Sequence, residues 1–306
     1  KVTLSIGFIL CLSLIILIQS CSERYNILTM HELPLPRPNG APLEFKAQSF
    51  PLDKLVHKGI FTPDHSRFYY VLSEKTFESF DIYFIEQSRK GWSKPQKATF
   101  NSAFIDHGIS FSPDGNTVYF SSTRPVEGEN VADTWHLWKS SKNGEFWSEP
   151  EYIDIPNLRN KLCSHPTITK SGTLYFHSSN TDYTEMDIFY SKKNGKQYKE
   201  AKKVSFSEAV IQGKTTAFVD YGESYLIFAS IDEGLKLMIS YPGKNEKWTT
   251  PVEFKSKINE HNQGNPFVTS DNKYLFFTMG SLPDVNWKIM WTNISQDLTN
   301  SNKNED

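Results

Sequence analysis

FSPDGNTVYFSS, residues 111–122, is one of five related segments in this chain of 306 residues. The other four are FTPDHSRFYY (61–70), TITKSGTLYF (167–176), FVDYGESYLIF (218–228) and FVTSDNKYLFF (267–277). Each joins two apolar stretches through a short polar turn, and dipeptides such as Asp-Gly and Ser-Gly favour the tight turns of β-hairpins. The turns follow one another at steps of 50, 57, 50 and 50 residues. A repeat of this length indicates one supersecondary unit copied along the chain.

Each copy continues with a third stretch that fits a strand, at residues 81–85, 136–139, 187–190, 236–239 and 288–291. Four copies also have a fourth element, marked by GWSKP (91–95), FWSEP (146–150), YKEA (198–201) and KWTTP (247–251). Proline is confined to edge strands of a sheet, so this element belongs at the outer rim. The repeat therefore predicts four-stranded blades, and its recurring tryptophans are expected to pack between blades.

The fifth copy lacks this fourth element, because the chain after Trp291 is rich in Asn, Ser, Asp and Lys. Residues 43–50 precede the first copy and can supply the missing strand. The prediction is an all-β, closed β-propeller of five four-stranded blades with N-terminal strand closure, which removes the open edges that a row of blades would expose. An aromatic-rich composition, with 22 Phe, 14 Tyr and 7 Trp, agrees with an all-β fold.

The first residues have the pattern of a leader. An apolar run over residues 2–18 ends in Ile-Gln-Ser before Cys21, which is typical of a lipoprotein signal peptide. We expect residues 1–20 to be a signal peptide, Cys21 to be lipidated, and the proline-rich residues 21–42 to be a tether. The propeller would occupy residues 43–294 and a disordered tail residues 295–306. An uncleaved membrane anchor is the alternative reading of the apolar run.

The Ser-Pro-Asp-Gly turn, the Tyr-Phe-Ser-Ser strand and the Asp-Ile-Phe-Tyr stretch at 187–190 resemble the TolB-like propeller repeat of exported bacterial proteins. The resemblance covers residues 43–294 and implies a β-propeller in the cell envelope. That family commonly closes six blades, so six blades are the alternative to the five visible copies. It implies no single function, because the fold hosts many. Nothing here is similar to the additional N-terminal domain of TolB.

Candidate binding residues lie at the start of each copy, where the innermost strands of a propeller enter the central channel. His57 and His107 occupy the same repeat position, His165 is offset by one, and Lys214 and Asn265 stand at this place in the last two copies. Three histidines at one mouth could bind a divalent metal, as in a metal-assisted polysaccharide lyase. Alternatively the imidazoles fill a wet channel and hydrogen-bond to neighbouring backbone, and the offset would turn His165 to the opposite face of its strand. We prefer the second interpretation and expect no metal and no cofactor.

No catalytic signature is visible elsewhere in the sequence. Asp106, Asp220 and Glu260 flank the inner strands but do not give the converging carboxylate pair of a glycosidase. A net charge of −2 gives no basic field for nucleic acid. The sequence thus predicts an outer-membrane lipoprotein, facing the periplasm or the cell surface, that binds a protein or glycan through its loop face and the membrane through its lipid. The alternative is a carbohydrate-active enzyme, a lyase or hydrolase using the channel histidines.

Overall fold

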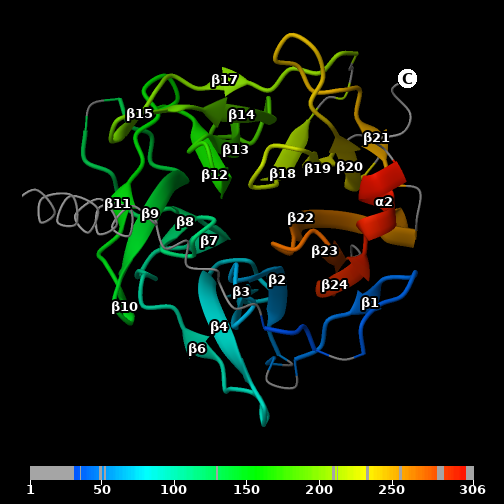
Figure 1. Ribbon diagram of the computed structural model, residues 1–306. Coiled ribbons are helices and arrows are strands. Elements are labelled where there is room, and N and C mark those ends of the chain that lie inside the picture. The colour runs from blue at the N-terminus through cyan, green and yellow to red at the C-terminus, as the bar shows by residue number, and fades with distance from the viewer. Residues whose placement is uncertain are drawn as a thin grey trace, which may run out of the picture.

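The computed structural model describes residues 31–300 except 35, 48–49, 52, 129, 209–210, 212, 232–233, 255–256 and 281–285. The predicted signal peptide and Cys21 lie outside these residues. Five small antiparallel sheets stand in a ring, with β2, β7, β12, β18 and β22 innermost (Figure 1). The all-β prediction and the count of five blades are confirmed, and the alternative of six blades is wrong.

Each blade is a meander that runs outward from the channel. Blade one contains β2 (Leu55–Phe61), β3 (Arg67–Ser73), β4 (Phe80–Ser88), β5 (Gly91–Trp92) and β6 (Gln96–Lys97). Blade two contains β7 (Asp106–Phe111), β8 (Thr117–Ser122), β9 (His136–Asn143), β10 (Phe146–Trp147) and β11 (Glu151–Tyr152). Blade three contains β12 (Leu162–Ile168), β13 (Leu174–Ser179), β14 (Asp187–Ser191) and β17 (Lys202–Lys203), with the small hairpin β15 (Lys193–Asn194) and β16 (Gln197–Tyr198).

The last two blades follow the same plan. Blade four contains β18 (Lys214–Val219), β19 (Leu226–Ser230), β20 (Lys236–Ser240) and β21 (Val252–Glu253), followed by the 3-10 turn η1 (Lys257–Asn259). Blade five contains β22 (Asn262–Val268), β23 (Tyr274–Gly280), β24 (Lys288–Asn293) and the distant strand β1 (Leu43–Glu44).

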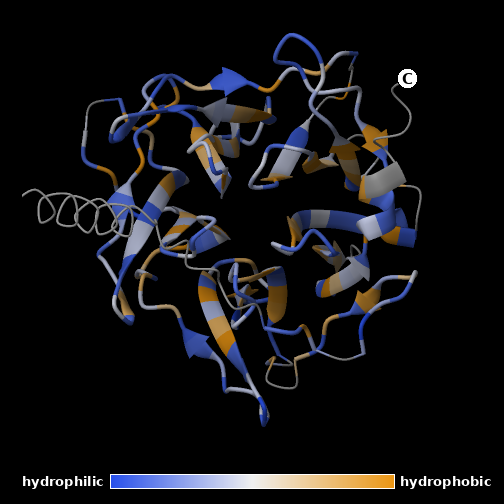
Figure 2. Ribbon diagram, in the orientation of Figure 1, coloured by the Kyte–Doolittle hydropathy of each residue, from blue (hydrophilic) through white to orange (hydrophobic). Residues whose placement is uncertain are grey.

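The hydrophobic core is divided among the five seams between neighbouring blades. Successive side chains of a strand point to opposite faces, and β3 shows the result. Phe68 and Tyr70 join the cluster shared with blade five, whereas Tyr69 and Val71 join the cluster shared with blade two. The other three buried clusters each combine two consecutive blades in the same way. Hydrophobic residues accordingly lie along the strands, and the outer turns are mostly hydrophilic (Figure 2).

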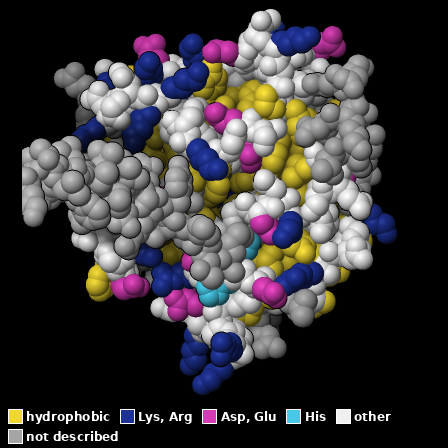
Figure 3. All heavy atoms as spheres, viewed as in Figure 1, with side chains coloured by type: hydrophobic (Ala, Val, Ile, Leu, Met, Phe, Trp, Pro, Cys, Tyr) yellow, Lys and Arg dark blue, Asp and Glu magenta, His cyan; other side chains and the backbone are white. Residues whose placement is uncertain are grey.

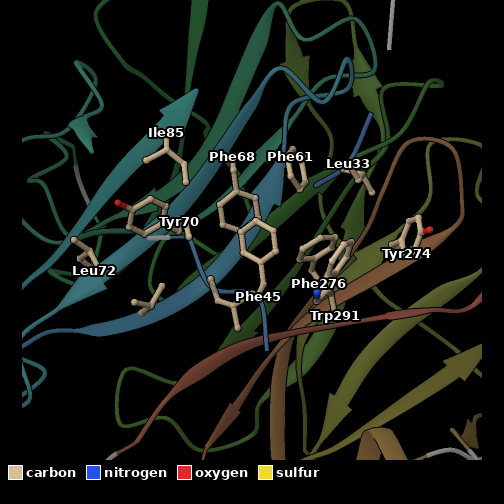
Figure 4. Packing of buried hydrophobic residues seen from close by; sticks show 13 residues of the cluster. Leu33, Phe45, Phe61, Phe68, Tyr70, Leu72, Ile85, Tyr274, Phe276 and Trp291 are labelled. Atoms are coloured by element: carbon tan, nitrogen blue, oxygen red, sulfur yellow. The ribbon is translucent and has the colours of Figure 1, made fainter. Parts of the chain in front are cut away.

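The seam between blades five and one also contains the N-terminal strand. Leu43 and Glu44 pair antiparallel with Trp291 and Met290 of β24. The next residue, Phe45, packs its ring against Phe68 at 4.4 Å and against Phe276 at 5.4 Å between ring centroids (Figure 4). The strand that the fifth copy lacks is thus present as β1, paired in antiparallel fashion at the outer edge of blade five.

Both flanks of the propeller differ from the sequence prediction. Part of the expected tether packs onto blade one, because Leu33 is buried in the same cluster as Phe45 and the His31 N–H donates to the Asp64 carbonyl at 2.8 Å. The expected disordered tail begins with a short helix, α2 (Ser295–Asn300), which follows the buried Ile294. Residues 301–306 lie outside the described part. Among the described residues no helix is long and apolar enough to cross a bilayer.

Candidate functional site

The five innermost strands share one irregularity, a β-bulge two or three residues after they enter the channel. The register shifts after His57, His107, Ser164, Thr215 and Gly264. In four blades the next residue has positive φ, namely Gly108, His165, Thr216 and Asn265. A bulge changes the direction of a side chain locally. The residue that follows the repeat position can therefore turn toward the channel as well.

This bulge brings the three predicted histidines together. The ring centroids of His57 and His107 lie 6.4 Å apart, and those of His107 and His165 lie 4.5 Å apart. The one-residue offset of His165 was expected to turn it away, and this expectation is wrong because φ is +56° at that residue. Gly108 makes the close approach feasible, since a Cβ there would come within 3.1 Å of the His165 backbone.

A fourth imidazole completes the group. The ring of His177, on β13, stacks on His165 at 4.8 Å. Its Nδ1 accepts the Thr216 N–H at 3.2 Å, so in the neutral ring the proton sits on Nε2. We call His57, His107, His165 and His177 the histidine cluster. They come from blades one, two and three, with β18 of blade four supplying the N–H that orients His177.

Burial keeps the histidine cluster neutral over most of the pH range. Loss of hydration lowers the pKa of His57 to about 4 and that of His177 to about 3. The pKa values of His107 and His165 are also held well below the usual 6.5, first by burial and then by neighbouring imidazoles and Lys58. Within the described residues, no three His, Cys, Asp or Glu side chains are arranged to hold a metal ion.

Four aromatic side chains lie close to the imidazole rings of His57 and His107. The ring of His57 lies 5.2 Å from Phe80 and 6.2 Å from Trp287, and the ring of His107 lies 5.9 Å from Trp135. Phe77, which is 37% exposed, adjoins His57 at 5.9 Å. We call Phe77, Phe80, Trp135 and Trp287 the aromatic rim. These four residues come from blades one, two and five, which meet at the same mouth.

The two remaining predicted site residues, Asn265 and Lys214, lie in different parts of the structure. Asn265 belongs to the site, because its side chain lies near His165 and favours protonation of that ring. Lys214 does not, because Thr215 rather than Lys214 holds the position that matches His57. The Lys214 ammonium points to the seam with blade three, where it pairs with Asp187 at 3.1 Å. There it lines an open groove of about 1030 Å³.

The carboxylates that flank the inner strands are used in the scaffold. Asp106 is fully buried and pairs with Arg124 at 2.7 Å. Asp220 accepts backbone N–H groups of its own hairpin turn, among them those of Gly222 and Tyr225. Asp81 pairs with Lys97, and Asp187 pairs with Lys214. Acidic and basic side chains are interspersed over the face seen in Figure 3.

Two residues of the site escaped sequence reasoning. His177 could have been noticed, because it replaces the first serine of the Tyr-Phe-Ser-Ser strand seen at Ser121. Lys58 follows His57 directly, but only the bulge in β2 reveals that its side chain is buried beside the histidine cluster. The aromatic rim lies mostly in connections between strands, whose spatial order the repeat does not predict.

Comparisons with known proteins support the fold. No family model matches the sequence, and no curated protein does so. Among solved structures, a protein of unknown function from Dyadobacter fermentans matches with a TM-score of 0.52 and 10% identity, over 85% of this chain and 84% of its own. TolB from Acinetobacter baumannii gives 0.48 and 12%, over 78% of this chain and 54% of its own, so the chain spans about half the length of TolB. A thermostable family-43 glycoside hydrolase gives 0.49 and 11%, over 78% and 89%. At these identities the likeness concerns the fold.

Proposed function

We propose that this protein is an exported, lipid-anchored propeller that binds a glycan at the mouth of its central channel. The observation that carries the proposal is the aromatic rim next to the histidine cluster. Rings from three blades converge on one mouth, where they contact His57 and His107. A concave aromatic lining with a few convergent polar groups is the usual composition of a small-molecule site.

The polar groups at this mouth suit a sugar better than an apolar ligand. Nε2 of His165 and Oδ1 of Asn265 are buried, and neither makes a hydrogen bond of good geometry among the described residues, although the Asn265 side chain is close enough to the His165 ring to raise the pKa of that ring. Buried polar atoms without partners are rare and call for an explanation. Hydroxyl groups of a sugar can satisfy both atoms, while the apolar face of the ring packs on an aromatic side chain.

Glycan binding can be tested with the purified full chain on a glycan array, followed by calorimetry with the glycans retained. We expect His107→Ala and Trp135→Ala to weaken binding at least tenfold with little loss of stability, since both side chains are only partly buried. Phe146→Ala is the control, because Phe146 is a strongly exposed aromatic residue in the outer hairpin of blade two. Retention of a protein partner with no glycan bound would refute the proposal.

Anchoring is part of the same proposal and rests on the Ile-Gln-Ser-Cys sequence that ends at Cys21. In a bacterial host, the wild-type chain should be recovered with the outer membrane, facing the periplasm or the cell surface. Cys21→Ala should be recovered unprocessed or in the soluble fraction, because no thiol remains for lipid attachment. Normal processing and membrane recovery of this variant would contradict the assignment.

An enzyme, the alternative function, would need either a metal or a carboxylate pair at the channel. The carboxylate of Asp106, the first residue of the channel strand β7, already forms an ion pair with Arg124. Elemental analysis of the purified protein tests the metal-dependent lyase, which requires one equivalent of bound metal. Metal bound at that ratio, and lost in His107→Ala, would favour the enzyme over the binding module.

A further inference from the structure

Lys58 is a buried cation without a partner. It lies at the bulge of the innermost strand β2, and the residue is 3% exposed. Within the described part of the chain it forms neither an ion pair nor a hydrogen bond, whereas Lys214, the other buried lysine there, is paired with Asp187. An ammonium group taken out of water is strongly unfavourable unless an opposite charge compensates it. The described residues therefore supply no compensating charge, and a bound anion can supply it.

Among the described residues, the neighbours of Lys58 are potential donors and include no acid. Its charge opposes protonation of His107, His165 and His177, which places all three within electrostatic reach of the ammonium. No carboxylate of the described residues contributes to the pKa of Lys58 or of these rings. Asp106, a buried acid at the start of β7, is already neutralised by Arg124.

We propose that the glycan bound at this mouth is an acidic one, and that Lys58 binds its carboxylate. This inference rests on the proposed function. A uronic acid residue has the groups that this site calls for. The apolar face of its ring can pack on the aromatic rim, its hydroxyls can hydrogen-bond to His165 and Asn265, and its carboxylate can supply the charge that Lys58 lacks among the described residues. A charge-assisted hydrogen bond between ammonium and carboxylate is about twice as strong as a neutral one.

The test compares two ligands that differ in charge alone. A uronic acid tetrasaccharide and the same tetrasaccharide with its carboxyl groups reduced to alcohols are titrated into the full chain by calorimetry. We expect the acidic ligand to bind at least tenfold more tightly. Lys58→Met, and Lys58→Gln as a second variant, should bind both ligands with equal, weak affinity. Lys97→Met, in the outer strand of blade one, should keep the preference.

The possible outcomes distinguish a failure of the acidic-ligand proposal from a failure of the underlying proposal that the protein binds a glycan. Equal binding of both tetrasaccharides by the wild-type protein, or an unchanged preference in folded Lys58→Met, refutes the acidic ligand and leaves a neutral glycan module. Binding of inorganic phosphate or sulfate that competes with the acidic tetrasaccharide, and is lost in Lys58→Met, supports an anion site at Lys58. If neither tetrasaccharide nor any arrayed glycan binds, the proposed function itself fails.

Discussion

Two regions of the propeller bury positive charge, and they treat it in opposite ways. At the seams, Arg124 pairs with the fully buried Asp106, and Lys214 pairs with Asp187. At the channel, Lys58 lies beside the neutral histidine cluster without an acidic partner among the described residues. A buried ion pair is a normal part of a scaffold, whereas an unpaired buried cation destabilises the fold. The comparison separates residues that stabilise the scaffold from residues that, under the proposal above, bind a ligand.

The largest effect is expected where a seam ion pair is broken. In Asp106→Ala, Arg124 stays largely buried, with 12% of its side chain exposed, and loses its carboxylate. Removing one partner of a buried pair costs about 3–5 kcal/mol. For a domain of this size each kcal/mol corresponds to about 2–4 °C, so we expect Tm to fall by roughly 6–20 °C. Differential scanning calorimetry measures this change.

Asp81→Ala is the matched control. Asp81 pairs with Lys97 at 2.8 Å, but 47% of the lysine side chain is exposed. Surface pairs contribute about 0–1 kcal/mol, so this variant should unfold within a few degrees of the wild type. If both substitutions lower Tm equally, the seam pairs have no special role and the comparison with the channel loses its basis.

The repeat made most of the fold predictable. Hairpin turns, alternating apolar residues and outer prolines are local features, and they determine the strands of each blade. The missing fourth element pointed to the N-terminal segment, which lies at β1. What the sequence did not reveal are the ends: Leu33 packs on blade one and residues 295–300 form a helix. Neither segment belongs to a repeat, so no periodic pattern described it.

The site was less predictable, because it depends on a backbone irregularity. Regular alternation placed His57 and His107 at one repeat position, and their rings do lie 6.4 Å apart, but it predicted that His165 would face away. The bulge reverses that orientation, and it also buries Lys58 and brings Asn265 toward His165. Lys214 was placed in the site by counting from the turn, whereas pairing with β19 shows that Thr215 has that position. A shift of one residue changes the face of a strand.

An intermediate effect on the free energy of unfolding is expected when Lys58 is replaced, and this substitution should stabilise the protein. Burial lowers its pKa to about 7, whereas the unfolded chain keeps a value near 10.5. Between these two values the unfolded state binds more protons, so the wild-type protein should become more stable as pH rises from 7 to 10. Lys58→Met should lack this rise and be more stable than the wild type at pH 7 by about 1–4 kcal/mol. Urea unfolding at several pH values measures both, and a destabilised Lys58→Met would show that the ammonium is compensated within the chain.

The smallest effect concerns a single imidazole. The pKa of His57 is lowered to about 4 by burial, and that of an unfolded histidine is near 6.5, so the unfolded state binds more protons between these two values. Stability contributed by the neutral ring is present above pH 6.5 and is lost as pH falls, by at most about 1.4 kcal/mol per pH unit for each histidine. Acidic side chains titrate mainly below this window, but Lys58, with its pKa of about 7, contributes at its upper end. In a Lys58→Met background the slope between pH 7.5 and pH 5.5 therefore reports the histidines. His57→Gln can keep the hydrogen bond to Ser73 and should reduce the loss over this range by about 1 kcal/mol. The exposed His261 provides the control variant His261→Gln. Equal unfolding free energies of the wild-type protein at pH 7.5 and pH 5.5 would mean that the imidazoles are hydrated in the folded state. The channel would then be exposed to water like an ordinary surface, and it would not be the desolvated site that the proposal requires.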